Sequence, residues 1–494
     1  MHLGDILVAH GLATAADVQR GLARQRERGG RLGDNLVALG IISVEELARV
    51  MTMAPPAPKS VVETGIGLNN LLNLLVKTMQ SRALERPSQL AEELKLPAPV
   101  IFELMQAAAE RRLMENLGVA ETNGFQEKRF QLTEAGRKRV LDALDQSQYV
   151  GPAPVPLASF EERILRQSIA NERIEKQAIF DAFSHLVIPE EFIRRLGPAI
   201  NSGRCILLYG PPGNGKTSIA EKIAAIFENV VYIPYCVEIS GELVKIFDPS
   251  LHEAVTRGPG QEVKSIRREN FDARWVACRR PVVITGGELT LDMLDLKFNP
   301  IAKYYEAPLH VKALNGTFII DDFGRQLLSP EQLLNRWIVP LQSRIDFLKL
   351  HTGKSFPLPF DELVIFSTNM SPADLMDPAF LRRIPYKLET KAPSEEEFTR
   401  IFEAAARKEG LELDPAIVRH VIDELLNGLK ADLSCYQPRF IVDQVVAACK
   451  YHGVPPAFTL EAVTDALNNL YPRHSLHPHA TLRPHPSSGR LAAE

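Results

Sequence analysis

A glycine-rich segment, Gly210-Pro-Pro-Gly-Asn-Gly-Lys-Thr217, constrains the fold of this chain more than any other feature. The apolar run Cys205-Ile-Leu-Leu-Tyr209 before it predicts a buried strand, and the run 218–227 after it carries apolar residues at helical spacing. A strand, a glycine turn and a helix start in this order place backbone N–H groups where they bind phosphate. Lys216 would neutralise the β- and γ-phosphates, and the Thr217 hydroxyl would ligate Mg²⁺. The residues expected to bind nucleotide are Gly210, Pro211, Pro212, Gly213, Asn214, Gly215, Lys216, Thr217 and Ser218.

Two apolar runs further along the chain predict buried strands that end in polar residues. The run 314–322 ends in two carboxylates, of which Asp321 would orient Mg²⁺ and Asp322 would polarise the attacking water. The run 363–369 ends in the amide of Asn369. Strands and helices alternate in this part of the chain, as they do in an α/β nucleotide-binding fold. We therefore expect both acids to serve the phosphate loop.

Two arginine-bearing motifs, Asp377-Pro-Ala-Phe-Leu-Arg-Arg383 and Gln437-Pro-Arg439, follow these strands. With them, the segment from about 160 to 471 resembles AAA+ ATPases. The resemblance implies an α/β core at 159–392 and a helical lid at 393–472. It also implies ATP and Mg²⁺ as cofactors, and a homo-oligomeric ring, expected to be a hexamer.

The resemblance assigns roles to single residues. It makes Asn369 the first sensor, Arg439 the second sensor in the lid, and either Arg382 or Arg383 the arginine finger that acts on a neighbouring subunit. Asp322 stands where the family usually has glutamate. Because aspartate is shorter by one methylene, it would hold water farther away, and we expect slow turnover or a nucleotide switch.

Between these motifs, residues 344–360 form two apolar alternating runs around a Thr-Gly-Lys turn. This pattern resembles the pre-sensor-one hairpin of MoxR chaperones, magnesium chelatase and sigma-54 activators. In that clade the hairpin lines the ring pore and moves substrate. The resemblance therefore implies the same place for this hairpin.

The first segment, residues 1–52, is an internal repeat. Leu3-Gly-Asp-Ile-Leu-Val-Ala-His-Gly11 recurs as Leu32-Gly-Asp-Asn-Leu-Val-Ala-Leu-Gly40. Each copy predicts a short helix that ends at its last glycine, and a second helix that begins at Thr14 or Ser43. We therefore expect a small all-α domain built from two equivalent halves.

This repeat resembles the MshEN domain of secretion and pilus ATPases, whose tandem motifs bind cyclic di-GMP. Val18 aligns with Leu47, but His2 stands where the first motif has arginine and Ala54 where the second has glutamine. Because a lost guanidinium weakens bidentate recognition, a docking domain without a nucleotide is the alternative. The residues that match the motifs are Leu3, Gly4, Leu7, Gly11, Gln25, Arg31, Leu32, Gly33, Leu36 and Gly40.

Residues 61–146 have the pattern of a winged helix-turn-helix. Apolar spacing predicts helices near 68–79 and 98–113, and the run 130–137 resembles the strand and helix after the wing. Such modules often bind DNA, yet the helix that would read bases has no Arg or Lys before Arg111. Base and phosphate contacts need cations or amides near the helix start. Protein docking is the favoured reading, and DNA binding is the alternative.

Length and composition limit the class of protein. At 494 residues the chain is long enough for about three domains. No apolar stretch approaches the ~20 residues that span a bilayer. Five cysteines without C-x-x-C spacing and a net charge of −4 indicate a cytoplasmic protein with no general attraction to nucleic acid. The proline-rich stretches 53–59 and 149–156 predict linkers, and residues 473–494 predict a disordered tail.

These features predict a multidomain protein with a tandem-repeat domain, a winged helix, an α/β phosphate-loop core and a helical lid. We expect an ATPase ring that remodels or regulates a protein client of a pilus, secretion or exopolysaccharide system, with cyclic di-GMP as its signal. An ATP-dependent, DNA-binding transcription regulator is the rival from another class. An adaptor that binds nucleotide without hydrolysis is a third hypothesis. His252 and Glu288 could form a metal or acid–base pair, but no second His or Cys cluster accompanies them, so we expect surface polar residues.

Overall fold

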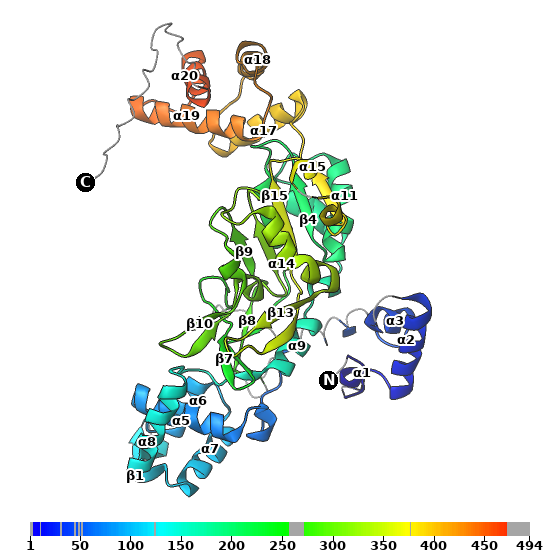
Figure 1. Ribbon diagram of the computed structural model, residues 1–494. Helices are drawn as coiled ribbons and strands as arrows, with labels where there is room; N and C mark the ends of the chain where they lie inside the picture. Colours follow the sequence, from blue (N-terminus) through cyan, green and yellow to red (C-terminus); the bar gives the residue numbers. More distant parts are fainter. Residues whose placement is uncertain are drawn as a thin grey trace, which may run out of the picture. The chain divides into compact units, whose positions relative to one another are not determined.

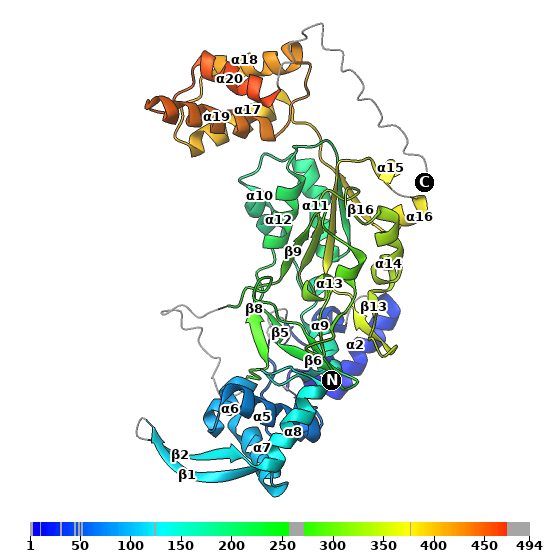
Figure 2. The same cartoon turned by 60° about the vertical axis from the view of Figure 1, so that its left-hand side comes forward.

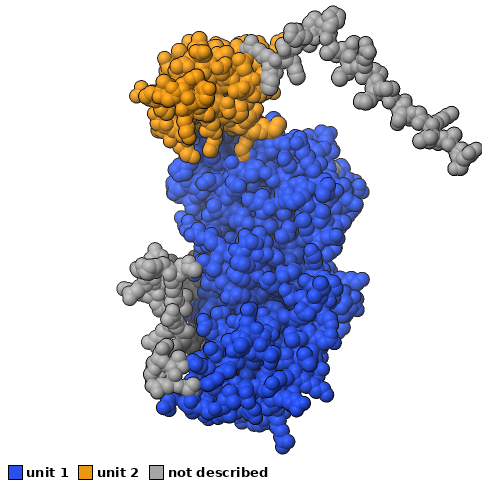
Figure 3. All heavy atoms as spheres, turned by 90° about the vertical axis from the view of Figure 1, so that its left-hand side faces the viewer, with its two compact units in different colours: residues 1–211, 216–390 blue, residues 212–215, 391–494 orange. Residues whose placement is uncertain are grey.

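The computed structural model describes residues 3–9, 11–29, 32–43, 46, 47, 50, 53–122, 125–255, 271–375 and 377–471. The chain divides into two compact units, one of residues 1–211 and 216–390 and the other of residues 212–215 and 391–494 (Figure 3). Within the described ranges, no helix combines the length and the apolar character that crossing a bilayer requires.

A five-stranded parallel sheet is the centre of the first unit, in the order β16-β4-β15-β12-β9. Its inner strands are buried on both faces, which explains their continuous apolar sequences. Figure 2 shows α10 and α12 on one side of the strands and α14 on the other, so the expected α/β core is confirmed. The bounds are β4 Ile206–Tyr209, β9 Val282–Thr285, β12 Thr317–Ile320, β15 Leu363–Thr368, β16 Tyr386–Glu389, α10 Lys176–Phe183, α11 Glu190–Ser202, α12 Lys216–Ala225 and α14 Pro330–Ser343.

A second β-layer lies beyond one end of the central sheet (Figure 1), and all its strands except β3 are inserted between α12 and β12. It holds a five-stranded sheet in the order β10-β11-β7-β6-β3 and the antiparallel pair β5 and β8. Apolar side chains of α9 pack against it. The bounds are β3 Val155–Pro156, β5 Val231–Pro234, β6 Cys236–Ile239, β7 Glu242–Lys245, β8 Trp275–Cys278, β10 Lys297–Asn299, β11 Tyr304–Glu306 and α9 Leu157–Arg166.

The hairpin expected at 344–360 is present as β13 (Ile345–Lys349) and β14 (Ser355–Pro359). Its inward side chains, including Leu348 and Leu358, join the core of the second β-layer. The ring of His351 at the turn stacks on Phe298 with centroids 4.1 Å apart. The opposite face of the hairpin stays exposed.

The two proline-rich stretches are packed, so the prediction that they are linkers is wrong. Tyr149 is buried, and its hydroxyl donates to the Pro152 carbonyl at 2.8 Å. The same stretch ends in β3, which pairs with β6 at the edge of the inserted sheet. In the other stretch the Pro55 carbonyl accepts from the Asp272 N–H at 2.8 Å. Proline is compatible with a sheet edge because it still offers a carbonyl and needs no donor there.

The N-terminal repeat contains α1 (Leu3–Ala9), α2 (Ala15–Arg28) and α3 (Leu32–Ala38). The expected turns are confirmed, because Gly11 and Gly40 both have positive φ, at 67° and 68°. Thr14 caps α2, and the Ser43 hydroxyl accepts from the Glu46 N–H at 3.1 Å in the same way. The two halves of the repeat therefore share local structure.

Residues 62–146 form three helices, a β-hairpin and a final helix around one apolar core. The first turn of the last helix packs closely on the backbone at Leu113, because a Cβ atom on Gly136 would lie 2.0 Å from the Leu113 carbonyl oxygen. This order of elements matches the predicted helices. The bounds are η1 Val62–Thr64, α5 Leu68–Arg82, α6 Pro87–Leu94, α7 Ala98–Glu110, β1 Met114–Thr122, β2 Phe125–Leu132 and α8 Glu134–Gln146. The expected hairpin tip, Asn123-Gly124, lies outside the described residues.

The second unit is helical, as the lid prediction required, and its helices pack on Phe398, Phe402 and Val445. Its helices are α17 Glu395–Lys408, α18 Pro415–Asp423, the π-helical turn Glu424–Gly428, α19 Tyr436–His452 and α20 Leu460–Leu470. The remaining short elements of the chain are η2 Ile169–Asn171, η3 Leu291–Leu294, α13 Leu309–Lys312, α15 Pro372–Leu375 and α16 Pro378–Leu381. The tail predicted at 473–494 lies outside the described residues.

Candidate nucleotide site

The predicted phosphate loop joins β4 to α12, and its glycines take backbone conformations that other residues avoid. Gly210, Gly213 and Gly215 have φ values of 138°, 77° and 76°. A Cβ atom on Gly210 would lie 2.1 Å from the carbonyl oxygen of Thr390, so no side chain fits there. The glycines of the motif are therefore required by the turn itself.

Lys216 begins α12, and its side chain is buried. The ammonium donates to the Gly210 carbonyl at 2.9 Å and to the Pro211 carbonyl at 2.8 Å. Burial lowers the pKa of Lys216, and the carboxylates of Asp322 and Asp321 oppose that shift. A buried ammonium bonded to two neutral carbonyls gains strongly from an anion, which a phosphate would supply.

Thr217 and Asp321 meet where β12 ends. The Thr217 hydroxyl donates to Asp321 Oδ2 at 2.7 Å. A hydroxyl and a carboxylate oxygen in contact suit Mg²⁺, which takes one or two protein oxygens beside phosphate and water ligands. The chemistry of this pair therefore fits the cation that the sequence implied.

Asp322 and Asn369 lie just beyond the ends of the neighbouring parallel strands β12 and β15. The Asn369 side-chain N–H donates to Asp322 Oδ1 at 3.1 Å. Asp322 has a φ of 48°, the left-handed region that a residue with a Cβ rarely adopts. Such strain persists only where the surroundings enforce it, and it is frequent at functional sites. The amide fixes the orientation of a carboxylate that faces solvent.

The three predicted arginines differ in their surroundings. Arg382 is exposed just beyond α16, whereas the guanidinium of Arg383 lies 5.7 Å from the centre of the Phe380 ring. Arg439 lies on α19 of the second unit, and its Nε is 3.7 Å from an Asp443 oxygen. This last pair is exposed on both sides. The structure thus brings together Lys216, Thr217 and the residues of β12 and β15, and it leaves Arg382 and Arg439 on surfaces.

Four of the residues expected to bind cyclic di-GMP have packing roles in the structure. Leu7 and Leu36 are fully buried in the small N-terminal core. A Cβ atom on Gly4 would lie 2.5 Å from Val18, and one on Gly33 would lie 2.9 Å from Leu47. The close packing of Val18 and Leu47 therefore explains why glycine occupies both positions, without a bound ligand. Arg31 and His2 lie outside the described residues, while Leu3, Gly11, Gln25, Leu32 and Gly40 lie within them.

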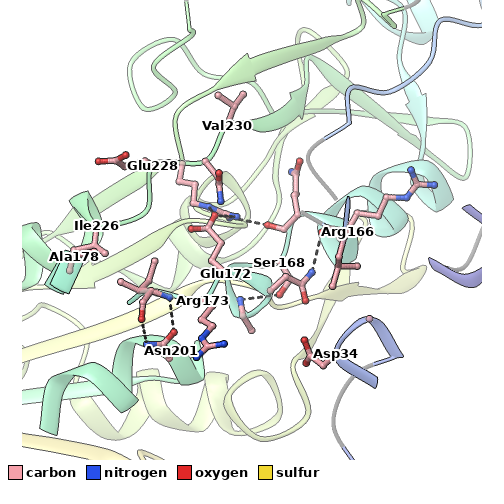
Figure 4. A pocket seen from close by; sticks show the side chains of 18 of the residues that line it. Asp34, Arg166, Ser168, Glu172, Arg173, Ala178, Asn201, Ile226, Glu228 and Val230 are labelled. Carbon is pink, nitrogen blue, oxygen red and sulfur yellow. Dashed lines mark hydrogen bonds and ion pairs between the residues drawn. The ribbon is translucent and has the colours of Figure 1, made fainter. Parts of the chain in front are cut away.

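A hollow of about 1330 Å³ occurs in the first unit, but it is not lined by the phosphate loop (Figure 4). Its polar walls are largely paired within the protein. Arg280 Nε donates to Glu172 at 2.6 Å, and the Ser168 hydroxyl donates to Asp361 at 2.6 Å. The amide of Asn201 donates to the Ile174 carbonyl at 3.0 Å. This hollow is therefore distinct from the predicted nucleotide site.

His252 is 2% exposed, so the expectation of a surface residue is wrong for it, and its role is structural. Its Nδ1 accepts from the Asp248 N–H at 2.9 Å, and its Nε2 lies 2.7 Å from the Lys312 carbonyl oxygen. Both ring nitrogens are thus occupied by backbone groups. Glu288 accepts from the Gly286 N–H at 2.9 Å, so neither residue needs a metal.

A buried ion cluster was missed by sequence reasoning. Asp346 of β13 accepts from Arg336 of α14 at 2.6 Å and 2.9 Å, and lies 2.9 Å from His310 Nε2 of α13. Burial alone would raise the pKa of Asp346, but the hydrogen bonds of His310 and Arg336 hold it well below its ordinary value. The cluster fastens the hairpin to α14. No local pattern marks it, because its members come from three separate elements.

A family model described as "ATPase family associated with various cellular activities (AAA)" matches residues 206–267, which contain the phosphate loop. The chain carries an AAA ATPase domain. A second family model, described as "Domain of unknown function (DUF8689)", matches residues 394–469, the helices of the second unit.

Two curated relatives are similar to part of this chain. The proteasome-activating nucleotidase of Archaeoglobus fulgidus is 26% identical over 219 residues, which are 42% of this chain and 53% of that protein. The 26S proteasome regulatory subunit 10B homolog A of Arabidopsis thaliana is 30% identical over 204 residues, which are 38% of this chain and 48% of that protein. The chain spans about half the length of the curated relatives it matches.

Solved structures with a similar arrangement include the RuvB Holliday junction branch migration motor of Thermotoga maritima, at 15% identity and a TM-score of 0.32. That match covers 57% of this chain and 70% of RuvB. NtrX from Brucella abortus matches at 13% identity and a TM-score of 0.35, over 66% of this chain and 59% of NtrX. Likeness at this level says nothing about activity or partners.

Proposed function

We propose that the protein is an ATPase that works as a homo-oligomeric ring of six subunits and remodels or regulates a protein client. The observation that carries this proposal is a pair of contacts beside the phosphate loop. Thr217 Oγ1 lies 2.7 Å from Asp321 Oδ2, and Asn369 Nδ2 lies 3.1 Å from Asp322 Oδ1. Together these pairs supply what phosphoryl transfer needs from a protein, a cation site and an oriented base.

In this mechanism the chain's own residues position the reactants. The loop N–H groups and Lys216 bind the phosphates, while Thr217 and Asp321 would hold Mg²⁺, which neutralises phosphate charge when bound. Asp322 accepts a hydrogen bond from the attacking water and orients it toward the γ-phosphate. Asn369 keeps that carboxylate in one orientation. Because Asp322 replaces the longer glutamate, we expect slow turnover.

The arginine finger is the reason that we propose a ring. Charge develops on the γ-phosphate in the transition state, and a guanidinium from a neighbouring subunit stabilises it. Arg382 is exposed, whereas Arg383 lies over the Phe380 ring. We therefore assign the finger to Arg382 and a packing role to Arg383. Closed rings follow when each subunit contributes such a group to the next.

The N-terminal segments would face the client. Helix α7, which would read bases in a DNA-binding module, instead exposes Phe102, whose side chain is 59% exposed. Glu103 and Glu110 are exposed on the same helix, so its surface repels phosphate. An exposed apolar side chain on a helix that also exposes acids suits a protein partner better than DNA. The exposed side chains Ile345 and Phe347 of the hairpin are a second place where a polypeptide could be held.

Residues 1–52 would receive the signal or dock the client. Calorimetry of the full chain with cyclic di-GMP decides between these roles. Heat that is lost on Gln25→Ala would support a signal domain, and no heat at tens of micromolar ligand would make it a docking domain. Packing of Gly4 and Gly33 against the neighbouring helix favours the second outcome.

Phosphate release by the purified protein tests the proposal. We expect release with Mg-ATP, its loss in Lys216→Ala, and ATP binding without release in Asp322→Asn. Binding without release by the wild type would make the protein a nucleotide-dependent adaptor. Salt-sensitive retention on duplex DNA would revive the transcription-regulator hypothesis, because phosphate contacts weaken steeply with salt.

A further inference from the structure

Helix α19 of the second unit begins without a capping side chain of its own. Cys435 precedes it and makes no side-chain cap. The first N–H groups of an α-helix have no partner within the helix, and a side chain just before it usually accepts from them. Here the Tyr436 N–H donates to the Gly213 carbonyl at 3.0 Å, and the Cys435 N–H donates to Asn214 Oδ1 at 3.2 Å. Both acceptors belong to the phosphate loop.

The aromatic ring of Tyr436 also packs against the phosphate loop. A Cβ atom on Gly213 would lie 2.3 Å from Cδ1 of Tyr436, so the ring lies directly against the loop backbone. Asn214 is 5% exposed, and its amide nitrogen has no hydrogen-bond partner among the described residues. The side-chain oxygen of Asn214 accepts a hydrogen bond from the lid, while its side-chain N–H groups remain available to donate to a further group.

The contact continues from α19 to the end of α20. Gln437 is fully buried, and its amide N–H groups donate to the Asp432 carbonyl and the Tyr471 hydroxyl, both at 3.0 Å. Its Oε1 accepts from the Ser434 N–H at 2.8 Å. Burial, together with hydrogen bonding to Tyr471, raises the pKa of Tyr436 to about 12. The start of α19 is therefore fixed on one side by the loop and on the other by α20.

We propose that the phosphate loop is the N-cap of α19, and that Asn214 and Tyr436 are positioning residues that report occupation of the loop to the lid. The inference rests on the proposed nucleotide function and adds the route by which the lid senses it. Phosphate bound to the loop N–H groups fixes the Gly213 carbonyl and the Asn214 amide. These acceptors then hold the first turn of α19, and Arg439 lies three residues farther along that helix.

Hydrogen exchange of the full chain, with and without saturating ADP or ATPγS, tests this route. We expect nucleotide to slow exchange in the peptide that covers residues 435–438. Asn214→Ala and Tyr436→Ala should abolish that slowing, because loss of a cap opens the first turn about fivefold more often. Their affinity for a fluorescent nucleotide should change less than the exchange does, since Asn214→Ala keeps the backbone N–H of the loop and neither variant alters Lys216.

Two variants make the test specific. Tyr436→Phe keeps the ring on Gly213 and should retain the nucleotide response. Tyr451→Ala removes an 87% exposed tyrosine from the other end of α19 and should leave the response unchanged. If Tyr436→Ala loosens the whole lid, Asn214→Ala decides, because its side chain lies outside the lid helices.

The possible failures are distinguishable. If the wild type binds no fluorescent nucleotide, the proposed function fails and the inference fails with it. If nucleotide binds but exchange at 435–438 does not respond, or responds equally in Asn214→Ala, only the role of the loop as a helix cap is refuted.

Discussion

Replacing Arg274 should loosen the attachment of residues 62–146, the segment of helices and a hairpin, to the second β-layer. The guanidinium donates to both oxygens of Asp272, at 3.0 Å and 2.8 Å. It also donates to the carbonyls of Thr64 at 3.0 Å and Pro154 at 2.9 Å. The Arg274 and Asp272 side chains are 5% and 4% exposed. One buried ion pair therefore joins three stretches of chain that are far apart in sequence.

Arg274→Ala leaves the Asp272 carboxylate buried without its counter-charge and two carbonyls without donors. Removing one partner of a buried ion pair costs about 3–5 kcal/mol. Arg279→Ala is the matched control, because its pair with Glu253 is 72% and 70% exposed and such pairs contribute about 0–1 kcal/mol. The double variant Arg274→Met, Asp272→Leu should recover much of the loss, since it removes both charges.

Segment-resolved hydrogen exchange is the suitable assay, because a protein with several domains does not unfold in one two-state step. We expect the opening free energy of residues 61–66 and 152–156 to fall by about 3 kcal/mol or more in Arg274→Ala. The core helices α5 and α7 should stay protected. A loss below about 1 kcal/mol, or an equal loss in Arg279→Ala, would refute the reasoning.

Three further predictions concern single residues. Burial lowers the pKa of Lys77 to about 8, so its charged form disfavours folding most below pH 8 and the penalty fades as pH rises toward 10.5. Lys77→Met should therefore raise the thermal midpoint at pH 7, with the gain shrinking by pH 10. Gly210→Ala should abolish binding of a fluorescent nucleotide, because the new Cβ meets the Thr390 carbonyl oxygen at 2.1 Å. Gly197→Ala should bind normally, because its new Cβ meets Ile179 Cδ1 at an ordinary contact distance of 3.4 Å. Asp322→Glu should raise kcat for phosphate release by about tenfold, because the longer side chain brings the base closer to the water; an unchanged kcat would remove its role as base.

The parts of the site that sequence predicted are those with local patterns. The glycine turn, the strand that ends in Asp321 and the strand that ends in Asn369 each carry their signal within ten residues. The parallel sheet then brings these strand ends together, which is why the predicted partners are in contact. The same holds for Gly11 and Gly40, whose positions in the repeat predicted their left-handed turns.

Contacts between distant segments could not be predicted in this way. Asn214 and Cys435 are 221 residues apart, and nothing near either residue indicates the other. Val155 and Pro156 were assigned to a linker because proline opposes regular structure, yet they form an edge strand of the inserted sheet. The partner strand, not the local sequence, determines their conformation.

A subunit-mixing experiment tests the shared nucleotide site most directly. Lys216→Ala subunits cannot bind phosphate and Arg382→Ala subunits cannot supply the finger, so each should release little phosphate alone. We predict that mixing them restores turnover, because an intact phosphate loop then meets an intact Arg382 from its neighbour, while Arg383→Ala keeps its activity throughout. A mixture that stays inactive, or an Arg382→Ala protein as active as the wild type, would contradict the account.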